Sequence, residues 1–165
     1  MSMKNSYKIF LVVNLILFIG YAIYATRAKE KIINEGKLVL LKLAPVDPRS
    51  LMQGDYMVLN YEISNNLPEN TPHKGFVILK ELEDGAFRAL KFQNFLNDLK
   101  ENEIAVEFIK IDSWQNSVKI GAESYFFEEG HAKKYEKAVY GGLRVDNKGN
   151  SVLVGLFDEN KKLIN

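Results

Sequence analysis

Residues 9–25 read IFLVVNLILFIGYAIYA, 17 residues without a charge, and Thr26 extends the uncharged stretch to 18. An α-helix of that length covers about 27 Å, close to the ~30 Å hydrocarbon thickness of a bilayer. A core helix of a small domain would carry a polar face, and here Asn14 is the only strongly polar residue. The stretch therefore predicts a transmembrane anchor over residues 9–26, in contact with the lipid bilayer.

The residues around this stretch favour an anchor over a cleaved signal peptide. A signal peptide ends in small residues before its cleavage site, whereas residues 23–25 are Ile-Tyr-Ala. We therefore expect a single-pass protein of the cytoplasmic membrane with a cytoplasmic tail over residues 1–8. Basic residues stand on both sides of the stretch, so the positive-inside rule does not set the orientation. A short basic tail ahead of a long C-terminal domain is the usual arrangement for an extracytoplasmic domain, which we expect here.

The composition of the rest of the chain indicates one folded domain. The full 165 residues suffice for a single domain and a short extra segment. Five of the 22 basic residues and one of the 21 acidic residues precede Ile32, which leaves 17 basic and 20 acidic residues after that point. Such a balance argues against nucleic acid as a partner. The absence of cysteine excludes disulfides, thiol nucleophiles and thiolate metal sites.

The pattern of the domain is that of a β-rich protein. Residues 27–36 are charged and end at Gly36, which predicts a stalk or a continuation of the anchor helix. The globular domain is expected over residues 37–165. The expected strands, which alternate or are compactly apolar between turn signals, are 38–43, 57–63, 75–82, 86–92, 103–111, 117–120, 143–145 and 151–157. Turns at 83–85 and 146–150 predict two hairpins.

Helical patterns are few in this domain. Residues 94–102 suit one helical turn, and residues 131–140 suit a helix closed by Gly141 and Gly142. A helix this short is marginal alone and must dock on the sheet. The fold class is therefore mainly β: an N-terminal transmembrane helix followed by a small β-barrel or β-sandwich domain with one short docked helix.

Residues 54–61 read GDYMVLNY and resemble the bacterial family named for the motif GDYXXLXY. The resemblance extends upstream over residues 46–51, which include Arg49, and downstream to a second block that begins GAESYF at Gly121. It implies membership of a membrane-anchored family of unknown function, whose members are often encoded near polytopic membrane proteins. The positions that carry the resemblance are Arg49, Gly54, Asp55, Tyr56, Leu59, Tyr61, Tyr125, Glu128, Glu129, Gly130 and Glu136.

The motif has a structural and a functional interpretation. In the structural one, Gly54 takes a positive φ at the strand entry, Asp55 bonds local backbone amides, and Leu59 and Tyr61 point to one buried face. In the functional one, Arg49, Asp55 and Tyr56 line a cleft at the strand end.

Three functions from different classes follow. The leading one is an accessory or interaction domain that acts with an integral membrane protein as its partner, because the anchor concentrates the domain beside such partners. The second is a hydrolase similar to signal peptidase I, using Ser50 with Lys80 or Lys91 as base, although the Ser-Met pair and the Ser-to-Gly spacing of that family are missing. The third is a ligand-binding or sensor domain using the cleft at Asp55 and Tyr56.

We expect neither a metal nor a cofactor. His73 and His131 show no ligand spacing, and the acids Glu128 and Glu129 precede a predicted helix, where the dipole favours negative charge.

Overall fold

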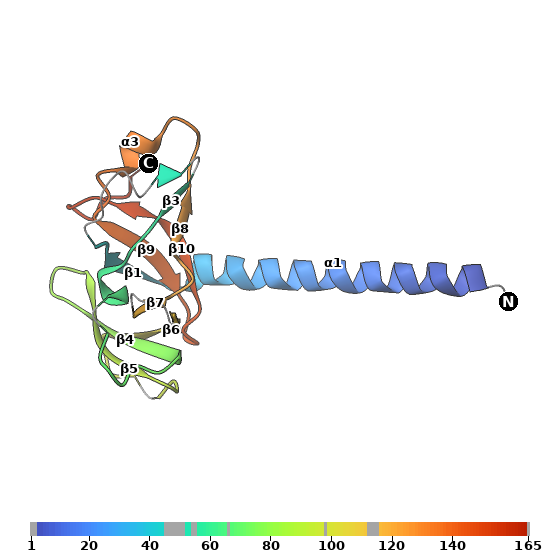
Figure 1. The fold of residues 1–165 in the computed structure, drawn as a ribbon, viewed down its shortest axis with the longest axis horizontal. Coiled ribbons are helices and arrows are strands. Elements are labelled where there is room, and N and C mark those ends of the chain that lie inside the picture. The colour runs from blue at the N-terminus through green and yellow to red at the C-terminus, as the bar shows by residue number, and fades with distance from the viewer. Residues whose placement is uncertain are drawn as a thin grey trace.

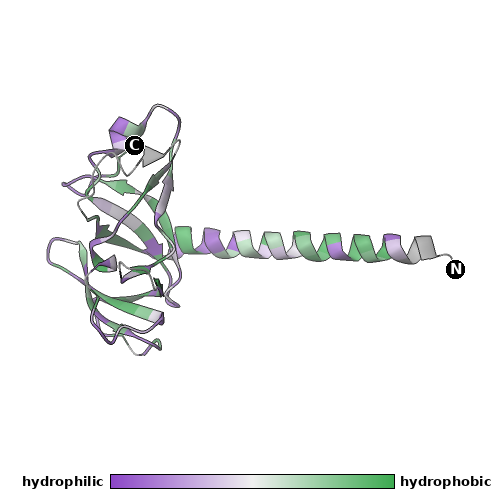
Figure 2. Cartoon of the chain, in the orientation of Figure 1, coloured by the Kyte–Doolittle hydropathy of each residue, from purple (hydrophilic) through white to green (hydrophobic). Residues whose placement is uncertain are grey.

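A long helix leaves one side of a curled β-domain in the computed structural model of the chain (Figure 1). The structure describes residues 3–44, 52–53, 56–65, 67–97, 99–111 and 116–164. Helix α1 spans Met3–Glu35, 33 residues in all. Its stretch Tyr7–Glu35 is long and apolar enough to cross a membrane, and none of its apolar window is buried against the domain. Figure 2 shows this apolar stretch followed by a more polar end at the domain.

Helix α1 is fixed to the domain at Gly36. The amide of Gly36 donates to the carbonyl of Ile32 at 2.9 Å, and Arg144 Nη1 donates to the Gly36 carbonyl at 2.8 Å. Ile32 is buried. A Cβ at position 36 would lie 2.5 Å from the Ile32 carbonyl oxygen and 3.0 Å from the Val145 backbone, so this close approach requires glycine. Of the two alternatives for residues 27–36, the structure shows a continuation of the helix.

Seven strands form the main sheet in the order β10-β9-β1-β5-β4-β6-β7. Only the pair of β1 and β5 is parallel, with Leu41 opposite Phe87, and the other neighbours are antiparallel. The strand bounds are β1 Lys37–Lys42, β4 Lys74–Glu81, β5 Phe87–Gln93, β6 Glu103–Ile111, β7 Ser117–Lys119, β9 Tyr140–Val145 and β10 Ser151–Phe157. The hairpins predicted from residues 83–85 and 146–150 are both present.

The sheet curls until its two ends approach each other. The Glu107 amide in β6 donates to the carbonyl of Gly149 in the β9–β10 turn at 2.9 Å. Ser151 Oγ in β10 donates to the carbonyl of Ile120, which follows β7, at 3.2 Å. The domain is thus mainly β, with a curled seven-stranded sheet that forms a half-barrel, an N-terminal apolar helix and one short helix, which confirms the predicted fold class.

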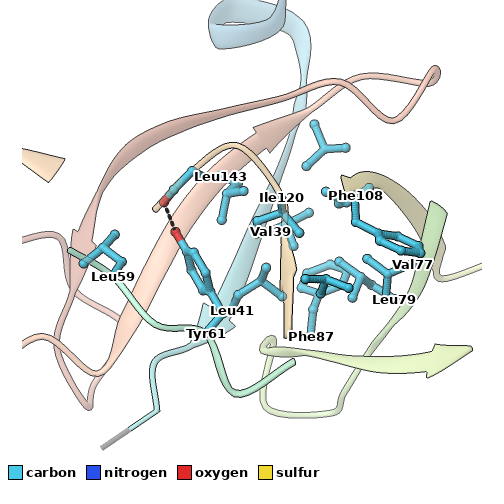
Figure 3. Packing of buried hydrophobic residues seen from close by; sticks show 14 of the residues in the cluster. Val39, Leu41, Leu59, Tyr61, Val77, Leu79, Phe87, Phe108, Ile120 and Leu143 are labelled. Carbon is cyan, nitrogen blue, oxygen red and sulfur yellow. Dashed lines mark hydrogen bonds between the residues drawn. The ribbon is translucent and has the colours of Figure 1, made fainter. Parts of the chain in front are cut away.

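The core fills the concave side of this half-barrel (Figure 3). Alternate residues of β1, β4, β6 and β9 point inward, as a strand period of two dictates. Fully buried members include Val39, Leu41, Val77, Leu79, Val106, Phe108 and Leu143, and the motif residues Leu59 and Tyr61 join the same cluster.

The strand predicted at residues 57–63 is shorter than expected. Strand β3 covers only Tyr56–Val58, and a 3₁₀ helix, η1, follows at Glu62–Ser64. Between them the chain crosses to β1, where Ala44 N donates to the Asn60 carbonyl at 2.7 Å. The strand ends early because Tyr61 enters the core from this crossing.

The helix predicted at residues 131–140 is present but shorter than expected. Helix α3 covers only Ala132–Tyr135, and Tyr140 opens β9, where it pairs with Lys42 and Phe157. Gly141 and Gly142, expected as a helix stop, lie inside β9. Ladder hydrogen bonds and burial outweigh a helix that is marginal in isolation. The described part of residues 94–102 contains no helical turn either; Asp98 lies outside the described residues.

Candidate functional site

The two blocks of the motif pair with each other. Strands β2 Met52–Gln53, β3 and β8 Ser124–Phe126 form a second sheet in the order β2-β3-β8. In it Tyr56 faces Phe126, Met57 faces Tyr125 and Val58 faces Ser124. The contact continues past the strand end, where Leu59 N donates to the Glu123 carbonyl at 2.7 Å. Residues 56–61 and 122–126 therefore form one antiparallel unit.

The inward side chains of this unit are structural. Leu59 and Tyr61 are both buried, as the structural interpretation of the motif requires. The Tyr61 hydroxyl donates to the carbonyl of Ala122 at 2.7 Å, the dashed line in Figure 3. Burial, and secondarily the charge of Glu123, raises the pKa of Tyr61 above its usual value. Tyr61 is therefore a neutral donor that joins the two blocks inside the core.

Gly141 makes room for the Tyr61 ring. A Cβ at position 141 would lie 2.7 Å from Tyr61 Cε1 and 2.9 Å from its hydroxyl oxygen. The ring thus packs directly on the backbone of β9, between the motif and the main sheet. Sequence reasoning missed both Ala122 and Gly141. The Gly141-Gly142 pair was the available signal, because consecutive glycines in a strand mark close approach of another group.

The outward side chains of the unit form an exposed apolar surface. Tyr56 and Phe126 are cross-strand partners with ring centroids 5.6 Å apart. Val58 is on the same face because it lies two residues from Tyr56. Phe126 is 73% exposed and Val58 46% exposed. We call Tyr56, Val58 and Phe126 the aromatic patch. Figure 1 shows β3 and β8 on the side of the domain from which α1 leaves.

The second block also docks helix α3. Tyr135 is buried and packs against Tyr125 at 5.1 Å and against Phe127 at 5.4 Å between ring centroids. Desolvation, together with the neighbouring Tyr135, raises the pKa of Tyr125 to about 12. The rings therefore belong to the packing of the short helix on β8.

The remaining acids of the second block lie around helix α3. Glu128, Glu129, Gly130 and Glu136 are exposed around α3. Gly130 has a φ of 83° and shapes the turn before the helix. Glu128 Oε2 lies 3.5 Å from Nδ1 of His131. Among the described residues, no three His, Asp or Glu side chains are grouped so that they would hold a metal ion.

Several sequence-predicted positions lie outside the described residues: Arg49, Ser50, Gly54 and Asp55. Of the cleft expected at Arg49, Asp55 and Tyr56, only Tyr56 is described, and it belongs to the aromatic patch. Lys80 in β4 and Lys91 in β5 are both exposed to solvent. Neither has the buried setting in which a lysine acts as general base.

The described part of the molecule also holds an open cavity of about 600 Å³ between β5 and η1. Lys42, Glu62, Arg88 and Lys91 line it, and no motif residue does.

The fold and motif define a class of protein. An apolar N-terminal helix is joined to a half-barrel, and residues 56–61, with the pattern Tyr-x-x-Leu-x-Tyr, place Leu59 and Tyr61 in its core. The model of the family GDYXXLXY protein matches residues 16–156, from within α1 to the penultimate residue of β10, and the chain belongs to this family. Neither a curated protein nor a solved structure matches the chain significantly.

Proposed function

We propose that this protein is an accessory or interaction domain, held at the cytoplasmic membrane by α1, that acts with an integral membrane protein. The domain lies on the extracytoplasmic side in this proposal. No catalytic step is part of this proposal.

The observation that carries the proposal is the exposed apolar surface of α1. Phe10, Ile16, Leu17 and Phe18 lie on different sides of the helix and are between 63% and 69% exposed. A helix that is apolar all round is stable only inside a protein core or a membrane. Since the domain covers none of the apolar window, a bilayer is the environment that fits it.

The aromatic patch supports a protein partner. Phe126 and Tyr56 are the residue types that anchor protein interfaces. Strands β3 and β8, which carry them, lie on the domain side from which α1 leaves, so the patch is within reach of an integral membrane protein beside α1. The family motif supplies Tyr56, and the second block supplies Phe126.

The proposal is tested by photo-crosslinking in native membranes. A benzophenone amino acid replaces Phe126 in one variant and Phe95 in the other, which is a matched control because Phe95 is 75% exposed on a loop away from the patch. We expect the position-126 variant to give an adduct with a protein that stays in the membrane after an alkaline carbonate wash. Tyr56→Ala should abolish that adduct, and the position-95 variant should not form it.

Two results would overturn the proposal. Release of the unmodified full-length chain by carbonate would show that α1 does not anchor the protein in the membrane. Identical adducts from positions 126 and 95 would show that the aromatic patch is not a specific contact with the partner.

A further inference from the structure

A basic cavity lies between the stalk of α1 and the edge of the main sheet. Its volume is about 370 Å³, and three lysines from separate parts of the chain line it: Lys29 of α1, Lys74 of β4 and Lys119 of β7. Gly121 and Gly149 complete part of the wall. Figure 1 shows β6 and β7 beside the domain end of α1.

The strand register explains why the lysines converge. Lys74 pairs with Ile109 of β6, and Ile109 pairs with Lys119 of β7. Directly opposite residues share a face of the sheet, so the two lysines flank Ile109 about 10 Å apart. Ile109 itself is 57% exposed. This face is turned to Lys29, because all four residues line the same cavity.

The charges in the cavity are not balanced. Among the described residues of the lining, Glu107 is the only acid, and it lies 3.2 Å from the Lys74 ammonium. Among the described residues, no carboxylate is within ion-pair distance of Lys29 or Lys119. The chain from Ile32 onward nevertheless holds 17 basic and 20 acidic residues. Two lysines in one cavity of an acidic domain, neither with a carboxylate partner in the described part of the chain, indicate an anionic ligand.

The position of Lys29 identifies the source of that ligand. Lys29 follows Thr26, the end of the uncharged stretch, by three residues, or about 4.5 Å of helix. The headgroup region extends about 5 to 7 Å beyond the hydrocarbon on each side. With α1 in a bilayer, Lys29 therefore lies at the depth of the lipid phosphates, and the cavity opens beside it.

We propose that this cavity binds the phosphodiester of an anionic phospholipid, with Lys29 and Lys119 as its charged contacts and Ile109 against the glycerol region. The inference rests on the proposed function, because it requires α1 to lie in the membrane. Binding here would fix the face that the domain turns to the bilayer and make that contact sensitive to lipid charge.

The test uses the purified full-length protein in zwitterionic micelles. Dioctanoyl phosphatidylglycerol, dioctanoyl phosphatidylcholine and inorganic phosphate are titrated at constant ionic strength, and the apparent Kd is obtained from the shift of the thermal midpoint. We expect phosphatidylglycerol to bind and phosphatidylcholine not to. Lys29→Gln and Lys119→Gln should each weaken binding about fivefold.

Lys80→Gln is the matched control. Lys80 is also exposed on β4, six residues or about 20 Å along the strand from Lys74. Its replacement by glutamine should leave the Kd for phosphatidylglycerol unchanged. An equal loss in Lys80→Gln, or equal binding of phosphatidylcholine, would overturn the proposal. Equal affinity for inorganic phosphate would show that the cavity recognises phosphate in general and not a phospholipid.

The outcome can be separated from that of the proposed function. If the chain resists carbonate extraction but does not bind phosphatidylglycerol, the lipid site is refuted and the proposed membrane anchor is not. Release of the chain by carbonate removes the anchor, whatever the micelle titration shows.

Discussion

The Tyr61 hydroxyl connects two segments that are 61 residues apart in the chain, through its bond to the Ala122 carbonyl. The ring occupies a space that Gly141 leaves open on β9. Three separate parts of the sequence thus meet at one side chain. The second tyrosine of the motif is explained by this packing and requires no catalytic role.

Replacing Tyr61 by phenylalanine tests that role. Tyr61→Phe keeps the ring but leaves the buried Ala122 carbonyl without its donor, so we expect the free energy of unfolding to fall by about 1–3 kcal/mol. Urea unfolding followed by circular dichroism measures it. Tyr140→Phe removes a hydroxyl with no hydrogen bond among the described residues and should cost less than about 0.5 kcal/mol. Equal losses in the two variants would contradict this account.

At the scale of elements, the β4–β5 turn is tied to the end of the chain. Asp84 Oδ2 lies 2.9 Å from Lys161 Nζ, and Lys161 also donates to the Asp84 carbonyl. The Ala86 amide donates to Asp84 Oδ1 at 3.0 Å. The hydrogen bond from Lys161, followed by that from Ala86, lowers the pKa of Asp84 below its usual value.

This contact predicts a pH-dependent stability difference. A folded-state pKa below the unfolded one stabilises the fold at pH values above the unfolded pKa, and the stabilisation is lost as the pH falls through the folded pKa. Asp84→Asn should therefore unfold at lower urea concentration than the wild type at pH 6, and the difference should shrink below about pH 4. Glu83→Gln, next to it in the turn, provides the control. A difference that stays constant down to pH 2 would show that Asp84 acts by another route.

Elements defined by local signals were predictable, whereas those defined by distant partners were not. The Asp84-Gly85 turn and the alternation in residues 103–111 act within a few positions, and both strands of each hairpin were found. The pairing of residues 56–61 with 122–126 depends on contacts across about sixty residues, which no local pattern encodes. Residues 131–140 have helical spacing, but the partners that draw Tyr140 into β9 are Lys42 and Phe157.

In the candidate site, too, the features set by local sequence were predictable and those set by distant partners were not. Alternation in the motif placed Leu59 and Tyr61 on the buried side, and both are buried. The exposed partner of Tyr56 is Phe126, which only the sheet register reveals. The lysines of the basic cavity are likewise scattered over α1, β4 and β7, so sequence alone gave no sign of their convergence.

At the scale of the whole molecule, the proposed membrane orientation can be tested directly because the chain has no cysteine. Glu159→Cys places a single thiol in an exposed turn of the domain, and Lys4→Cys places one in the N-terminal tail. We expect a membrane-impermeant maleimide to label the Glu159→Cys variant in intact cells, and the Lys4→Cys variant only after lysis. The reverse pattern would place the domain in the cytoplasm.

The junction at Gly36 has a mechanical consequence. The helix reaches Glu35 without a break, Ile32 is buried in the domain, and Arg144 bonds the Gly36 carbonyl, so there is no swivel between α1 and the half-barrel. Membrane helices tilt by about 20° on average, and more when the bilayer is thin. In the proposed membrane-anchored arrangement, a tilt of α1 would therefore rotate the half-barrel with it. In that arrangement, a change in bilayer thickness would change the orientation of the whole domain relative to the membrane.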